Sequence, residues 1–232
     1  MCPVVYQVFA NNIWRSTRSI RAVSRAPSLR LRGARNVSTL PENPHIYVHK
    51  HPLDPSKSLL SLLPTEPATP QLAIGTTTAF PVTPNNFTSN PSFLTILSSV
   101  YATHATSDPY VVQQASVFAS PGGSFLQPSS NASSDGSGGA NHQGGAGGAG
   151  HGGWIHISDL RNPPDYGRIA WPEDIMGSVE VDGRGQFSDG AWQDSGTYRI
   201  VTREGILGMT DFMRGKMVER LQELEREIKQ KS

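Results

Sequence analysis

The segment 45–51 contains the side chains with the clearest potential for metal chemistry. Histidine or tyrosine recurs there at every second position, in the order His45, Tyr47, His49 and His51, and such residues share one face of an extended strand. The spacing of His49 and His51 is that of H-x-H strands that hold one divalent ion. The further ligands would come from His104, His156 or Asp159. Because spacing supplies no third ligand, the polar edge of a half-buried strand is the favoured interpretation, and we expect no metal.

Carboxylates are concentrated in the C-terminal part of the chain, and two of them could perform general acid–base chemistry of the glycosidase kind. They are Asp159, Asp165, Glu173, Asp174, Glu180 and Asp182. Arginines at 161, 168 and 199 offer ion-pair partners, so caps, turns and ion pairs are the favoured roles. Aromatic residues of the same region are expected to form the core and rim of a domain, or alternatively to line a ligand pocket. They are Trp154, Tyr166, Trp171, Trp192 and Tyr198.

The usual signatures of cofactor and nucleophile chemistry are missing or out of context. The sequence of residues 145–150 fits the dinucleotide-binding pattern G-x-G-x-x-G. However, no predicted strand precedes it and no helix-forming run follows it, as a dinucleotide site would require. Neither a G-x-S-x-G elbow nor a G-x-x-x-x-G-K-[ST] loop occurs. We therefore assign no catalytic residue and expect no bound cofactor.

The first 40 residues differ from the rest of the chain in charge. They contain seven arginines and no acid, with apolar residues between the arginines, whereas the remainder has a formal charge of −6. Such a segment is typical of a mitochondrial presequence, and we expect it to span residues 1–37 and to be removed near Arg35. The alternative is a basic arm that binds nucleic acid or an anionic membrane; nucleic acid is not the partner that we expect.

The single cysteine, Cys2, lies inside this segment. A chain cleaved near residue 37 would contain no thiol, which excludes disulfides, thiolate nucleophiles and cysteine-ligated metals. No run of about 18 apolar residues occurs, so we expect no membrane-spanning helix.

Hydrophobic periodicity and capping residues predict a mixture of helices and strands. Strands are predicted at 45–51, 71–78, 153–157, 178–182 and 198–202, with a hairpin turn at Asp182-Gly183 and a return strand from Gln186. Helices are predicted after Asp54-Pro55 through Leu63, from Asn90-Pro91, after Asp108-Pro109 at 110–119, and from Thr210 onward, with Asn90, Asp108 and Thr210 as the capping residues. Because the order shows no βαβ repeat, we expect one α+β domain over residues 44–220 with a mixed or antiparallel sheet.

Residues 129–153 interrupt this domain with ten glycines in 25 positions. Such a composition cannot bury enough apolar surface to offset its ordering entropy. We expect a flexible insert there.

The predicted C-terminal helix, residues 210–230, has an apolar seam formed by Met217, Leu221, Leu224 and Ile228. Its four-three-four spacing resembles two heptads of a coiled coil, and Glu225 and Lys229 form a favourable i, i+4 pair. The helix either packs on its own domain up to about Val218 and offers the seam to a protein partner, or packs on the domain throughout.

The sequences GWIHISDLRNPPDYGRIAWPEDIMGSVEVD and YRIVTREGILGMTDFM, within residues 154–213, resemble an uncharacterised family of mitochondrially addressed fungal proteins. The resemblance covers about a quarter of the chain and implies a mitochondrial location, but no catalytic residue. We therefore expect an accessory or interaction protein of the mitochondrial matrix, associated with a larger assembly. The alternative is a small hydrolase-like enzyme that uses a metal at His49 and His51 or a pair of carboxylates.

Overall fold

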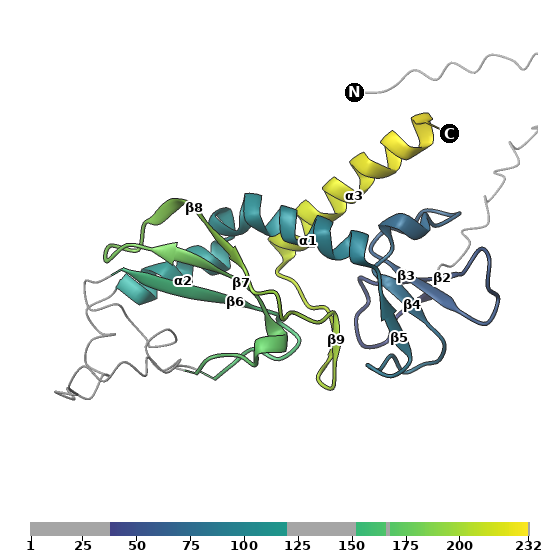
Figure 1. Ribbon diagram of the computed structural model, residues 1–232, viewed down its shortest axis with the longest axis horizontal. Helices are drawn as coiled ribbons and strands as arrows, with labels where there is room; N and C mark the ends of the chain where they lie inside the picture. Colours follow the sequence, from purple (N-terminus) through teal and green to yellow (C-terminus); the bar gives the residue numbers. More distant parts are fainter. Residues whose placement is uncertain (1–37, 120–151, 166–167, 232) are drawn as a thin grey trace, which may run out of the picture. The chain divides into compact units, whose positions relative to one another are not determined.

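The computed structural model describes residues 38–119, 152–165 and 168–231, which form an α+β structure with antiparallel sheets (Figure 1). The predicted α+β class with a long C-terminal helix is confirmed. The strands are β1 (Ser38–Thr39), β2 (Tyr47–Lys50), β3 (Ser58–Ser61), β4 (Gly75–Thr77), β5 (Phe87–Ser89), β6 (Gly153–Ser158), β7 (Ile175–Val181), β8 (Phe187–Asp194), β9 (Val201–Thr202) and β10 (Gly205–Ile206). The α-helices are α1 (Pro91–His104), α2 (Pro109–Ala119) and α3 (Asp211–Lys231), and short 3₁₀ helices are η1 (Pro70–Leu72), η2 (Ala105–Ser107) and η5 (Pro172–Asp174).

The presequence, Cys2, the predicted cleavage near Arg35 and the motif at 145–150 lie outside the described residues. So does nearly all of the predicted glycine-rich insert.

The strands β1 to β5 form an antiparallel sheet in which each strand pairs with the next one along the chain. The helix predicted after Asp54-Pro55 is wrong, since this segment closes the turn between β2 and β3. The Asp54 carboxylate accepts a hydrogen bond from the Ser56 N–H (3.1 Å), and the Lys57 N–H donates to the Asp54 carbonyl (3.1 Å).

The leucines of that segment explain the wrong prediction. All of them are buried, with exposed fractions of 3% or less: Leu59, Leu60, Leu62 and Leu63. A strand that is buried on both faces has a continuous apolar run, and over so few residues this run resembles the apolar face of a helix.

The strands β6, β7 and β8 form a second antiparallel sheet with α2 against β6 (Figure 1). A turn joins β7 and β8 at the predicted position, but it extends beyond the dipeptide Asp182-Gly183. The Asp182 carboxylate accepts hydrogen bonds from the N–H groups of Arg184 and Gln186, both 2.8 Å. Gly185 in this turn has φ of +78°, and a Cβ there would lie 2.8 Å from the Ala115 carbonyl oxygen of α2. The turn therefore requires glycine both for its backbone angle and for the close approach of the helix.

The helices α1 and α2 begin at capping residues that the sequence predicted. The Asn90 carboxamide oxygen accepts from the Ser92 N–H, while its nitrogen donates to the carbonyl oxygens of Pro70, Gln71 and Ala73. Asp108 accepts from the Tyr110 N–H (2.9 Å) at the start of α2. Asn90 thus fixes the start of α1 to the loop around η1 as well as capping the helix.

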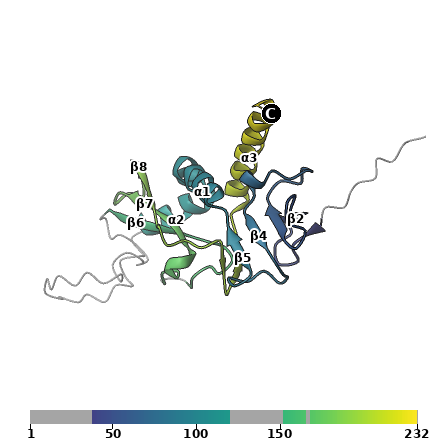
Figure 2. The same ribbon diagram turned by 45° about the vertical axis from the view of Figure 1, so that its right-hand side comes forward.

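The helix α3 contacts both α1 and η1, and it lies between α1 and the strands of the first sheet in Figure 2. Thr210 caps it by accepting from the Met213 N–H (3.1 Å), as predicted. Met217 and Leu221 of the apolar seam are completely buried in this chain, and Leu224 and Ile228 are partly buried against the same core. At Met217 and Leu221, the seam therefore packs on its own domain instead of facing a partner.

A polar contact extends this packing toward the end of α3. Glu225 is buried, accepts a hydrogen bond from the Thr65 hydroxyl (2.7 Å) and pairs with Lys229 (3.2 Å). The predicted i, i+4 pair is therefore present. Within the described residues, no helix is long and apolar enough to cross a membrane.

One hydrophobic core joins the sheets β1–β5 and β6–β8, the two-stranded sheet β9–β10, and the helices α1, α2 and α3. It includes Leu60 of β3, Phe93 of α1, Val111 of α2, Val179 of β7 and Met217 of α3. The residues before and after the interruption at 120–151 therefore contribute to the same interior, as expected for one domain.

Candidate functional site

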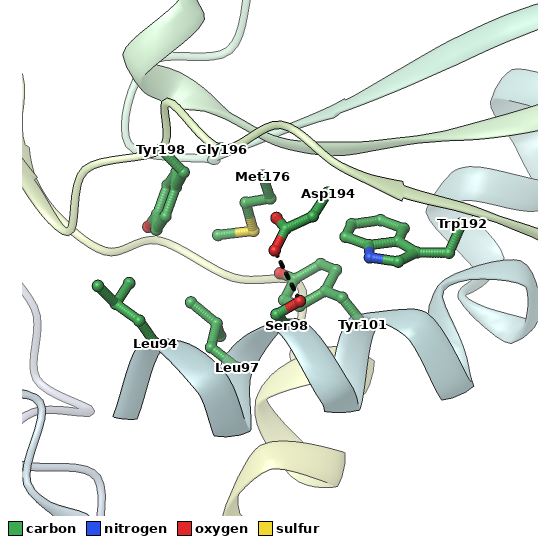
Figure 3. A pocket seen from close by; sticks show the side chains of 9 residues that line it. All are labelled: Leu94, Leu97, Ser98, Tyr101, Met176, Trp192, Asp194, Gly196 and Tyr198. Atoms are coloured by element: carbon green, nitrogen blue, oxygen red, sulfur yellow. Dashed lines mark hydrogen bonds between the residues drawn. The ribbon is translucent and has the colours of Figure 1, made fainter. Parts of the chain in front are cut away.

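A pocket of about 150 Å³ opens between α1, the strands β7 and β8, and the segment after β8 (Figure 3). Its lining residues are mostly apolar or aromatic: Leu94, Leu97, Ser98, Tyr101, Met176, Trp192, Asp194, Gly196 and Tyr198. A concave apolar site with few polar groups is the usual form of a small-molecule site. This pocket is therefore the candidate binding site.

The helix α1 supplies one wall of the pocket through its periodicity. Leu94, Leu97, Ser98 and Tyr101 have i, i+3, i+4 and i+7 spacing, which places them on one face of the helix. Their neighbours Phe93 and Val100 turn into the core. A single helix thus contributes to both the interior and the pocket.

The strand β8 supplies the opposite wall. Trp192 and Asp194 are two residues apart and so lie on the same face of the strand. The Trp192 indole packs over Gly177 of β7, where a Cβ would lie 2.3 Å from Cζ2 of the indole. Glycine at 177 therefore makes room for the ring beside the pocket, and the Tyr101 and Trp192 ring centroids are 5.7 Å apart.

The segment after β8 is held by its hydroxyl side chains. The Ser195 hydroxyl donates to the Ile175 carbonyl (2.5 Å), and the Thr197 hydroxyl donates to the Pro172 carbonyl (2.7 Å). These bonds position Gly196 and Tyr198 at the pocket.

The two polar side chains of the pocket lining that are bonded to each other are Ser98 and Asp194. The Ser98 hydroxyl donates to Asp194 Oδ2 at 2.8 Å (Figure 3). A serine nucleophile normally needs a base such as histidine within hydrogen-bond reach, and no histidine lines this pocket. Asp194 remains exposed and can accept a further hydrogen bond or pair with a cation.

A buried ionic network centred on Arg161 lies behind Tyr198. The guanidinium bonds to Asp174 through Nε (2.8 Å) and Nη2 (2.7 Å), and Nη1 lies 3.5 Å from Asp159 Oδ2. It also donates to the carbonyl oxygens of Glu173, Arg199 and Ile200. The three charged side chains are at most 3% exposed. The guanidinium of Arg161 therefore finds its hydrogen-bond acceptors within the chain, and it holds three segments together.

Tyr198 connects this network to the pocket. Its hydroxyl donates to Asp159 Oδ2 (2.7 Å), and its ring lies 5.5 Å from the Arg161 guanidinium carbon. Asp159 Oδ1 accepts from the N–H groups of Arg161 (2.9 Å) and Gly208 (2.8 Å). Every lone pair of this carboxylate that faces the interior has a partner, which is typical of a structural buried ion pair.

Burial determines the protonation behaviour of this region. Desolvation raises the pKa of Asp159, and the opposing charge of Arg161 only partly offsets the increase. Desolvation and then the charge of Asp159 raise the pKa of Tyr198 well above 10. For Tyr101, burial is again the largest cause, followed by the charges of Asp159 and Asp108, and its pKa is also well above 10. Both tyrosines are neutral hydrogen-bonding groups at physiological pH.

Three of the histidines considered as metal ligands, His49, His51 and His156, occupy separate environments. His49 is buried in β2, and its Nε2 lies 2.9 Å from the Leu63 carbonyl oxygen. His51 Nδ1 accepts from the N–H groups of Leu53 and Asp54. His156 lies in the other sheet, on β6, with Nδ1 2.7 Å from the Ser178 hydroxyl. Nowhere in the described ranges do three or more His, Cys, Asp or Glu side chains form a group that could hold a metal ion.

The expectation that the histidines of 45–51 form a solvent-facing edge is wrong for His49, which is only 6% exposed. Its bond to a main-chain carbonyl compensates for the burial of one ring nitrogen.

The remaining predicted acids have local roles. Asp165 is exposed beside Arg168, Glu180 is exposed on β7, and Asp182 closes the hairpin turn. Glu173 contributes its carbonyl oxygen to Arg161. The structure therefore brings together only Asp159 and Asp174, with Arg161 between them.

The predicted aromatic residues divide between the two roles. Trp192 and Tyr198 line the pocket, Trp154 is half-buried on β6, and Trp171 is 71% exposed. Tyr166 lies outside the described residues. The sequence missed Ser98 and Asp194, although the position of Asp194 two residues after Trp192 is a strand spacing that could have identified it.

Comparison of the chain with protein-family models, with curated proteins and with solved structures finds no match. The fold and the pocket define the molecule as an α+β protein with a small pocket lined partly by aromatic side chains.

Proposed function

We propose that the chain is a mitochondrial accessory protein that acts by binding a partner within a larger assembly. The observation that supports the proposal is that the buried charged side chains pair with one another. Asp159, Arg161 and Asp174 are buried and paired with one another, so a substrate cannot reach them. The exposed polar pair in the pocket, Ser98 and Asp194, has no histidine beside it.

The arginine-rich segment 1–37 supports the mitochondrial location. N-terminal sequencing of the endogenous protein tests it. We expect a start near Ser38, and an intact N-terminus in a non-mitochondrial fraction would contradict the proposal.

The end of α3 is the proposed contact with the partner. Met217 and Leu221 belong to the core, whereas Leu224 and Ile228 retain partial exposure. These last turns also carry the exposed charges of Glu223, Arg226, Glu227 and Lys229. An apolar centre with a charged rim is common in protein interfaces.

Size fractionation of gently lysed mitochondria tests the association. We expect the protein to migrate well above its monomer mass of 25.1 kDa or the lower mass of its cleaved form. The substitutions Leu224→Ser and Ile228→Ser together should return it to the monomer fraction, whereas Arg226→Gln, on the exposed side, should not. Migration of the wild type only as a monomer would contradict the proposal, provided that circular dichroism confirms that each variant is folded.

A further inference from the structure

We propose that the pocket between α1 and β8 binds a small organic ammonium ion, of the size of tetramethylammonium or the headgroup of choline. The residues that line the pocket favour such a cation. Three aromatic side chains, Tyr101, Trp192 and Tyr198, and the carboxylate of Asp194 converge there, and the described lining contains neither lysine nor arginine. Aromatic rings with a carboxylate are the combination that recognises alkylated ammonium groups in water.

The charge of the pocket favours a cation. Asp194 is exposed at the pocket, and the Ser98 hydroxyl holds its Oδ2 in place at 2.8 Å (Figure 3). A positive group that enters the pocket therefore meets the negative charge of Asp194.

Arg161 is the nearest positive group that could oppose this binding, because it stacks on the Tyr198 ring at 5.5 Å. Its charge is compensated by both Asp159 and Asp174, and its side chain is not part of the lining. The rings of Trp192 and Tyr101 pack against each other with their centroids 5.7 Å apart, and both rings line the pocket. Indole is the ring that attracts cations most strongly.

The size of the pocket selects a small ligand. A cavity of about 150 Å³ accommodates a molecule about as large as benzene, and this pocket has that volume. Leu94, Leu97 and Met176 provide the aliphatic and thioether surface against which N-methyl groups can pack. An inorganic cation would leave this surface unused, whereas a larger amphiphile would not fit inside.

Titration of the full chain with tetramethylammonium and with choline tests the proposal, monitored by the indole N–H resonance of Trp192 in ¹⁵N NMR spectra. The matched neutral probe is 3,3-dimethylbutan-1-ol, which replaces the quaternary nitrogen of choline with carbon. We expect saturable shifts of the Trp192 resonance with both cations and much weaker binding of the neutral alcohol. Because the pair differs only in charge, the comparison isolates the electrostatic part of recognition.

Asp194→Asn should weaken binding of choline by about fivefold to tenfold, since it removes the charge but preserves the shape of the side chain. Asp189→Asn, an exposed acid on the same strand β8 that does not line the pocket, is the control and should bind like the wild type. Trp192→Leu keeps an apolar wall but removes the indole. Its binding, followed through the methyl resonances of Leu97, should fall by a similar factor.

Equal affinity for choline and the neutral alcohol would overturn the proposal in favour of a purely apolar site. Unchanged binding in Asp194→Asn, or the same loss in Asp189→Asn, would also overturn it. So would the absence of a saturable shift up to about 20 mM, well above the millimolar range of a weak site. The measurement uses no partner protein, so its result is independent of whether the chain belongs to a larger assembly.

Discussion

Arg161 is the side chain on which most of the buried polar structure depends. It compensates Asp159 and Asp174 and bonds to three carbonyl oxygens, one from the segment between β6 and β7 and two from the segment after β8. Replacement by methionine would leave two buried carboxylates without their cation. We expect Arg161→Met to lower the free energy of unfolding by about 3–5 kcal/mol, measured by urea denaturation.

Arg168→Met is the matched control, because Arg168 and its partner Asp165 are both largely exposed. Its free energy of unfolding should change by less than about 0.5 kcal/mol. Similar losses in the two variants would show that the Arg161 network does not stabilise the fold.

His156 gives stability a predictable pH dependence. Its burial lowers its pKa below 6.5, so the unfolded chain binds the proton more tightly. The contribution of His156 is therefore complete above pH 6.5 and is lost as the pH falls through the lower value of the folded state. Between about pH 7.5 and about pH 5.5, we expect the urea midpoint of the wild type to fall further than that of His156→Gln. Parallel pH profiles of the two proteins would contradict this expectation.

At the scale of single residues, the sequence identified several roles and missed others for a physical reason. The turn at Asp182 and the cap at Asn90 depend on neighbours within four residues, and both are present at the predicted positions. The burial of His49 and the contact between Ser98 and Asp194 depend on segments far away in sequence. Spacing along one segment contains no information on such contacts.

The starts of helices α2 and α3 are joined by one hydrogen bond. Asp108 caps α2 through the Tyr110 N–H, Thr210 caps α3 through the Met213 N–H, and the Thr210 hydroxyl donates to Asp108 at 2.6 Å. Thr210→Val preserves the shape but removes the hydroxyl. We expect it to lower the free energy of unfolding by about 1–2 kcal/mol, whereas Thr210→Ser should retain most of the stability.

A double-mutant cycle with Asp108→Ala tests the connection between the two helices. Because the hydroxyl and the carboxylate are in direct contact, the coupling energy should exceed about 0.5 kcal/mol. Additive effects of the two substitutions would mean that each cap acts alone.

Helix starts were predicted more precisely than the limits of strands because their signals are local. Pro91, Pro109 and Thr210 mark helix starts that the structure places within one residue, since a cap and a periodic face lie within a few turns. The segment 58–61 was predicted as helix because both of its faces are buried. Only the neighbouring strands, which the sequence does not reveal, make it a strand.

At the scale of the whole molecule, the class of fold followed from composition and order, but the pairing did not. The division into the sheets β1–β5 and β6–β8 depends on which strands meet. The packing of α3 depends on contacts such as that of Thr65 with Glu225, which are 160 residues apart. Such contacts are set by the shape of the complete core.

The shared core predicts that both sheets unfold together. Leu60 of β3 is fully buried in the same cluster as Val179 of β7, and Leu60→Ala should cost about 2–5 kcal/mol. Residues 38–119 contain no tryptophan. In a background with Trp14→Phe and Trp171→Phe, fluorescence therefore reports only Trp154 and Trp192 of the second sheet. If folding is cooperative, Leu60→Ala lowers the fluorescence midpoint and the circular-dichroism midpoint by the same amount. A fluorescence transition that stays at its original midpoint would mean that the sheets unfold as separate units, and the pocket would then be formed by the second unit with α1 alone.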